Sequence, residues 1–162
     1  MSKKVATSYE LEKLGILLEE YEIEALVAKH KPQNITIRFD AEWLEGDALA
    51  ASFPQMDTSK PYFITLSPLI LQYGLTDREA FSTIILHELG HIVDRIRNWT
   101  RYVSLQPEDI EALEYEADDF VIACGWKSSL VRTLRRTIAF RPEDKRSEGM
   151  VTKRLSRLSV AN

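Results

Sequence analysis

Residues 87–91 read His-Glu-Leu-Gly-His, a stretch whose residue types and spacing can do chemistry. Two histidines four residues apart on a helix project from the same face, so His87 and His91 can share one metal ion. Glu88 can then reach a water molecule at that ion and act as its general base. We expect one zinc ion per chain, because zinc binds imidazole nitrogen and carboxylate oxygen in an open tetrahedral site.

Two histidines do not complete a catalytic zinc site, which needs a third protein ligand beside the position left for water. His30 is the only other histidine, and its spacing to the motif carries no information. The metzincin extension of the motif would place a histidine at position 97, which is Arg97 here. The third ligand is therefore predicted to be a carboxylate.

Glu114 is the best candidate for that carboxylate. Glu114 and Asp118 lie four residues apart and share a helical face with apolar residues that are expected to point inward. A carboxylate on such a face is costly unless it meets a cation. We expect Glu114 to bind zinc and Asp118 to accept the outer N–H of His87, which would fix that ring. Asp94 is the alternative ligand, but it would have to reach back along its own helix.

A long helix is predicted to carry the histidines. Thr76 and Glu79 match a capping box at its start, and Gly90 is the only helix-breaking residue inside it, at about 1 kcal/mol relative to Ala. A small residue there would let a strand or substrate approach the metal face. Apolar residues recur at helical spacing along this segment: Ala80, Phe81, Ile84, Ile85, Leu89, Ile92, Val93 and Ile96.

The remaining segments predict a single α+β domain over residues 1–162. Strands are expected at residues 35–40, 48–53 and 62–66, forming a small, mainly antiparallel sheet packed on the motif helix. Helices are expected at 7–31, from Pro107 to before Gly125, at 127–139 and at 142–158, with a short helix or turn at 67–73. Residues 98–106 show no period and are predicted to be a loop.

The composition is that of a globular protein, with 44% apolar and 28% charged residues. The apolar runs are too short to span a bilayer, and no signal peptide is predicted. The single cysteine, Cys124, cannot form an internal disulfide. Together these features favour a cytoplasmic location.

The charges are unevenly distributed along the chain. Residues 126–162 contain ten Lys/Arg and three Asp/Glu, whereas residues 1–125 contain 11 and 22. The basic end could bind an acidic partner, but helices docked on the acidic body explain it better. No nucleic-acid motif accompanies the basic residues, so we expect no nucleic-acid partner.

The two motifs together resemble those of the gluzincin metallopeptidases, in particular the HtpX-like and CAAX prenyl endopeptidase type. In that family His-Glu-x-x-His is followed by Glu-x-x-x-Asp on a later helix, as at residues 87–91 and 114–118. The resemblance covers roughly residues 60–140 and implies a zincin-like fold with zinc on His87, His91 and Glu114, Glu88 as base and Asp118 behind the first histidine. This chain departs from those relatives in having no transmembrane helices. The ImmA/IrrE-type peptidases, which act on repressors, have a similar spacing, commonly with Asn where Asp118 stands.

These residues predict hydrolysis of peptide bonds in a protein or peptide substrate, with Glu88 moving a proton from water to the leaving amine. An extended substrate would pair with the edge of strand 48–53 or 62–66. A stabiliser of the oxyanion is expected among Tyr102, Tyr115, Arg95 and the Arg132–Arg136 group. The alternative is a zincin-fold regulatory or binding module whose basic C-terminal third engages another macromolecule.

Overall fold

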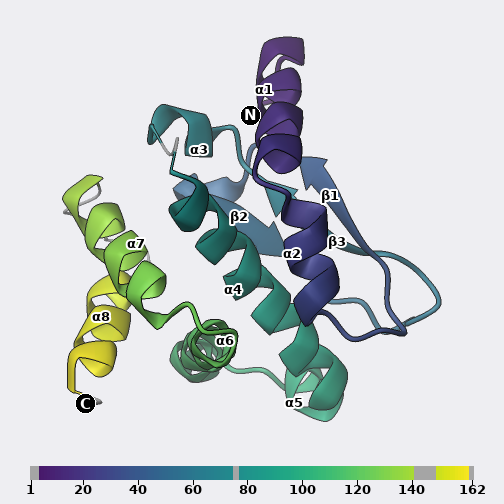
Figure 1. The fold of residues 1–162 in the computed structure, drawn as a ribbon. Helices are drawn as coiled ribbons and strands as arrows, with labels where there is room; N and C mark the ends of the chain where they lie inside the picture. Colours follow the sequence, from purple (N-terminus) through teal and green to yellow (C-terminus); the bar gives the residue numbers. More distant parts are fainter. Residues whose placement is uncertain (1–3, 75–76, 141–148, 161–162) are drawn as a thin grey trace.

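The computed structural model describes residues 4–74, 77–140 and 149–160, and these form an α+β fold that is mostly helical. The predicted α+β class is therefore confirmed. Figure 1 shows the order of the elements. They are α1 (Ser8–Glu20), α2 (Ile23–His30), β1 (Ile37–Ala41), the 3-10 turn η1 (Glu45–Asp47), β2 (Ala50–Ser52), β3 (Tyr62–Leu66), α3 (Leu69–Gln72), α4 (Arg78–Arg97), α5 (Trp99–Val103), the 3-10 turn η2 (Pro107–Asp109), α6 (Ile110–Ala123), α7 (Lys127–Phe140) and α8 (Met150–Val160).

The sheet has three strands in the order β1-β3-β2, with β3 in the centre. β3 pairs antiparallel with β2 and parallel with β1, so the sheet is mixed and the predicted mainly antiparallel sheet is wrong. The chain reverses direction at each strand, and β3 then inserts between the two earlier strands, which leaves it parallel to β1. As a result β2 is an edge strand, and its last residue is the buried Ser52.

Helix α4 is the central element of the fold, in contact with β2 and β3 on one side and with α2, α6 and α7 around it. In Figure 1 it runs diagonally through the middle of the molecule. Every residue from Ala80 to Val93 except Ile84 is buried, as expected for a helix that crosses a core. The Asp77 carboxylate caps its N-terminus by accepting the backbone N–H groups of Glu79 and Ala80. The predicted cap, Thr76, lies outside the described residues.

Helix α6 packs closely against α4 at Gly90. A Cβ atom on Gly90 would lie 3.0 Å from the carbonyl oxygen of Ala117 and 3.0 Å from Cβ of Phe120. The sequence suggested that the small residue admits a strand or a substrate, but it admits a neighbouring helix. Glycine therefore sets the short separation between the helix that carries the histidines and the helix that carries Glu114.

Three other predicted segments differ from the structure. The helix predicted at 7–31 is two helices, α1 and α2, because the chain turns at Glu22, whose φ of 52° is left-handed. The predicted loop at 98–106 contains the short helix α5. The helix predicted from residue 142 is described only from α8 onward, since 141–148 lie outside the described residues.

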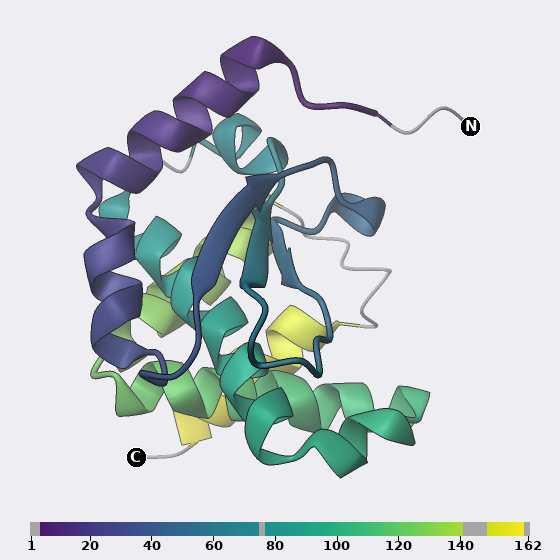
Figure 2. The same ribbon diagram turned by 90° about the vertical axis from the view of Figure 1, so that its right-hand side faces the viewer.

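The basic C-terminal helices dock on the acidic body, as the charge distribution favoured. Arg132 of α7 pairs with Asp77 and Glu79 at the start of α4, and Arg157 of α8 pairs with Asp119 of α6. Figure 2 shows α6 at the end of the molecule opposite the α1 helix, with α7 running from that end up behind the sheet. Within the part of the chain that is described, every helix is too short or too polar to cross a membrane.

Candidate metal centre

The two imidazoles of the motif face one carboxylate from another helix. Nε2 of His87 lies 3.1 Å from Oε2 of Glu114, and Nε2 of His91 lies 3.3 Å from its Oε1. Ligand atoms about 2.0–2.1 Å from a tetrahedral zinc ion are about 3.3 Å from one another, so these separations fit a shared ion. Both histidines are 8% exposed and the Glu114 side chain is 23% exposed, so the group keeps some contact with solvent.

Glu88 lies beside the histidines and is positioned by the edge strand. One ligand atom each from His87, Glu88 and His91 all fall within 4.8 Å of one another, so this buried group could hold a metal ion. The Ser52 hydroxyl of β2 donates a hydrogen bond of 3.1 Å to Oε2 of Glu88. Two carboxylates therefore compete for the place of third ligand. We favour Glu114, because each of its oxygens faces a different Nε2 atom, whereas an oxygen of Glu88 is bonded to Ser52.

A chain of polar contacts fixes the far side of the His87 ring. Its Nδ1 atom lies 3.0 Å from Oδ1 of Asp118, which is completely buried. Arg154 of α8 donates from Nε and Nη2 to the two oxygens of Asp118, at 2.9 and 2.6 Å, and its Nη1 lies 3.2 Å from Oε2 of Glu114. Arg154 therefore links Asp118 and Glu114 from a third helix. Sequence reasoning did not find it, because nothing in the local pattern of α8 sets it apart.

The neighbouring charges strongly shift the pKa values of Glu114 and His87. Burial opposes ionisation of Glu114, but the charge and hydrogen bond of His87, with His91 and Arg154 beside it, hold its pKa well below the ordinary value. Burial and Arg154 act to lower the pKa of His87, yet Glu114 and Asp118 outweigh them and raise it to about 9. A metal ion that binds Nε2 of His87 therefore competes with a proton for that atom.

The other candidate ligands lie in different surroundings. The Asp94 carboxylate accepts hydrogen bonds from the Tyr102 hydroxyl and from Nδ2 of Asn98, at 2.8 Å for the latter, so it is directed toward the C-terminal end of α4. His30 is the last residue of α2, and none of the contacts found among the described residues joins it to the motif.

Replacing Glu114 with Ala is expected to lower zinc affinity by at least about 10-fold, because one of the three protein ligands is lost while both histidines remain. The matched control is Asp94→Ala, a carboxylate removed from α4 itself, which is expected to leave the affinity unchanged. Zinc bound per chain, measured by titration with a competing chelator, checks both. Loss of affinity in the Asp94 variant but not in the Glu114 variant would make Asp94, rather than Glu114, the third ligand.

A comparison of the chain with protein-family models, with curated proteins and with solved structures found no match in any of the three. The interpretation of the site therefore rests on its geometry and on the resemblance of its motifs.

Proposed function

We propose that the protein is a zinc-dependent endopeptidase of zincin-like fold, related to the gluzincin or ImmA/IrrE-type peptidases, acting in the cytoplasm. The observation that carries the proposal is the convergence of Glu114 on both imidazoles, with Glu88 beside them. His87, His91 and Glu114 would hold one zinc ion. A bound zinc ion supplies Lewis-acid polarisation of the scissile carbonyl and lowers the pKa of a coordinated water toward 7.

Glu88 performs the proton transfer in this proposal. Ser52 occupies its Oε2 atom, so Oε1 accepts the proton of the attacking water and then delivers it to the nitrogen of the leaving amine. The water oxygen bonds to the carbonyl carbon as Glu88 takes the proton, and the carbon–nitrogen bond breaks once that proton has reached the nitrogen, so the protein returns to its starting state. Asp118 holds the His87 ring by accepting its Nδ1–H, which leaves Nε2 directed at the metal position.

The edge strand β2 provides a place for an extended substrate. Its pairing partner β3 covers one edge only, and Ser52 at its end contacts Glu88. A peptide added to the other edge by backbone hydrogen bonds would therefore run past the catalytic carboxylate. This supports a protein or peptide substrate presented in extended form.

The alternative of a binding module that uses the basic C-terminal third receives less support. Five cations of the described part of that region pair with carboxylates of the body: Arg132 with Asp77 and Glu79, Arg136 with Asp77, Lys153 with Glu111, Arg154 with Asp118, and Arg157 with Asp119. Cations already paired within the chain have less charge to offer an acidic partner.

Removal and restoration of the metal tests the proposal. Treatment with a chelator is expected to abolish hydrolysis of an unfolded protein such as reduced casein, and one equivalent of zinc is expected to restore it. Protein treated with a metal-saturated chelator is the control. Hydrolysis that persists in protein shown to be metal-free contradicts the proposal, and so does a zinc-loaded protein that cleaves no unfolded substrate.

A further inference from the structure

Arg95 is a partly buried cation whose guanidinium lies 5.7 Å from the centre of the Tyr102 ring and forms no ion pair among the described residues. Its Nη1 atom donates a hydrogen bond of 3.1 Å to Oγ of Ser52. Its Nε atom is buried and has no hydrogen-bond partner. Glu88 and Asp94 act on Arg95 electrostatically, yet within the described residues neither carboxylate lies at ion-pair distance from it. Burial accordingly lowers the pKa of the guanidinium.

Arg154 is a buried arginine of the same fold whose charge is paired within the chain. Its guanidinium is bonded to Asp118 through two nitrogens and lies 3.2 Å from Glu114. Burial would lower the pKa of Arg154, but these carboxylates outweigh burial and raise it. A buried arginine is normally satisfied in this way, because an unpaired buried charge is costly. Arg95 lies over the Tyr102 ring and forms no ion pair among the described residues, so its charge is less fully compensated than that of Arg154 and is available to a partner from outside.

The position of Arg95 defines where that partner would lie. Arg95 follows His91 by four residues on α4, so the two side chains share a face of the helix. Ser52 accepts from Arg95 and donates to Glu88, which places the guanidinium one hydroxyl group away from the catalytic carboxylate. Ser52 also ends the edge strand on which an extended peptide would pair. The cation thus lies beside the expected path of the substrate, next to the scissile bond.

We propose that Arg95, positioned by Ser52, forms an anion subsite that binds a carboxylate of the peptide substrate adjacent to the bond that is cleaved. The guanidinium still has Nη–H groups that Ser52 does not occupy, and a charge-assisted hydrogen bond from them suits the oxygens of a carboxylate. The carboxylate comes either from an Asp or Glu side chain or from a free C-terminus. The inference rests on the proposed peptidase function and adds its substrate class.

The binding arm of the test uses metal-free protein, so that a carboxylate cannot gain affinity by contacting zinc. Four hexapeptides combine a central Glu or Gln with a free or amidated C-terminus, and calorimetry gives their dissociation constants. We expect a peptide with the recognised carboxylate to bind at least about 10-fold more tightly than its amide counterpart. Comparison of the four peptides identifies whether the side chain or the C-terminus supplies it.

Variants assign the preference to Arg95. Arg95→Gln is expected to bind all four peptides with the same affinity, and Arg95→Lys to keep only part of the preference, because it retains the charge without the guanidinium. Arg97→Gln removes the same charge from an exposed position on α4 and is expected to behave as the wild type. Equal affinities in the wild type overturn the inference, as does a preference that survives in Arg95→Gln or disappears in Arg97→Gln.

The kinetic arm separates this subsite from the proposed function. In zinc-loaded protein, Arg95→Gln is expected to raise KM for the carboxylate peptide about 10-fold more than it raises KM for the amide peptide. An equal fall in kcat for both peptides would make Arg95 an oxyanion donor and would overturn the subsite. If no peptide is cleaved while the binding preference is present, the peptidase proposal fails and the anion site stands.

Discussion

Replacing Glu88 with Gln is expected to lower kcat for peptide hydrolysis by about 10²–10⁴-fold, the usual contribution of a general base. The amide has the shape of the carboxylate and can still accept a hydrogen bond from Ser52, but it cannot take a proton from water. Zinc should remain bound, because His87, His91 and Glu114 are unchanged. The measurement combines kcat on an unfolded protein substrate with metal analysis of the same preparation.

Ser52→Ala provides the matched control for this variant. It removes the hydrogen bond to Oε2 of Glu88 and leaves the carboxylate in place, so the expected loss in kcat is below about 10-fold. A Glu88→Gln protein with wild-type kcat would exclude Glu88 as the general base. A Glu88→Gln protein that loses its zinc would make Glu88, rather than Glu114, the third ligand.

The sequence contained enough information to predict the part of the site that lies on α4 and α6. The spacing of His87 and His91 places them on one helical face, and the same periodicity places Glu114 and Asp118 on one face of a second helix. The requirement of zinc for a third ligand then connects the two helices. These are local patterns joined by one chemical condition, which is why the contacts of Glu114 could be anticipated.

The contacts made by other elements could not be predicted in the same way. Ser52, Arg95 and Arg154 meet the motif residues only because β2 and α8 pack against α4 and α6. Their positions depend on the strand order and on helix docking, which are set by the whole core rather than by any short window of sequence. The left-handed residue Glu22, which breaks the predicted first helix, is a further case, because glutamate is not a typical residue for that conformation.

Removing the charge of Asp118 is expected to destabilise the metal-free protein by about 3 kcal/mol, the lower end of the range for breaking a buried ion pair. Asp118 is fully buried and bonded to both His87 and Arg154. In Asp118→Asn the side-chain carbonyl can still accept the Nδ1–H of His87, but Arg154 is left facing Glu114 alone. The free energy of unfolding in urea, measured without metal, gives the effect.

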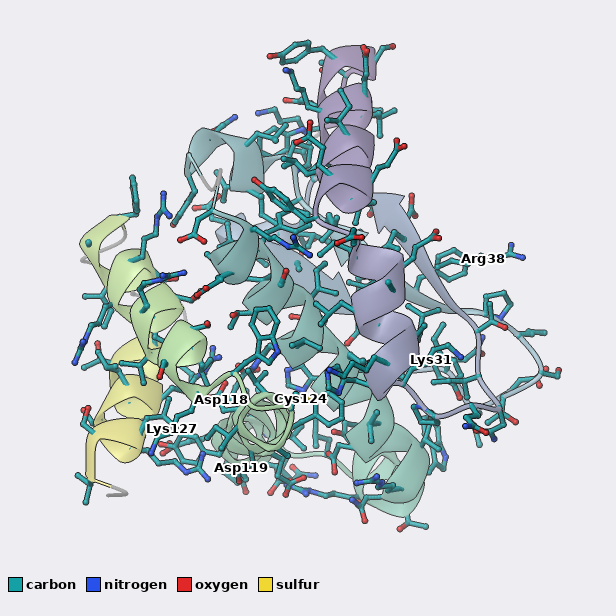
Figure 3. The ribbon with its side chains drawn as sticks, viewed as in Figure 1. Lys31, Arg38, Asp118, Asp119, Cys124 and Lys127 are labelled. Carbon is teal, nitrogen blue, oxygen red and sulfur yellow. The ribbon has the colours of Figure 1, made fainter. Side chains whose placement is uncertain are left out.

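A neighbouring residue and a double variant show whether this effect comes from the buried charge. Asp119 adjoins Asp118 on α6, and Figure 3 labels these two residues. The side chain of Asp119 is 54% exposed and pairs with Arg157 at the surface. Asp119→Asn is expected to change the free energy of unfolding by less than about 0.5 kcal/mol. The double variant Asp118→Asn/Arg154→Met removes both charges and should be more stable than Asp118→Asn alone, because no unpaired cation remains. The single variant Arg154→Met completes the comparison. A double variant whose loss of stability equals the sum of the losses in Asp118→Asn and Arg154→Met would mean that Arg154 contributes through packing, and Asp118 would then serve mainly to orient His87.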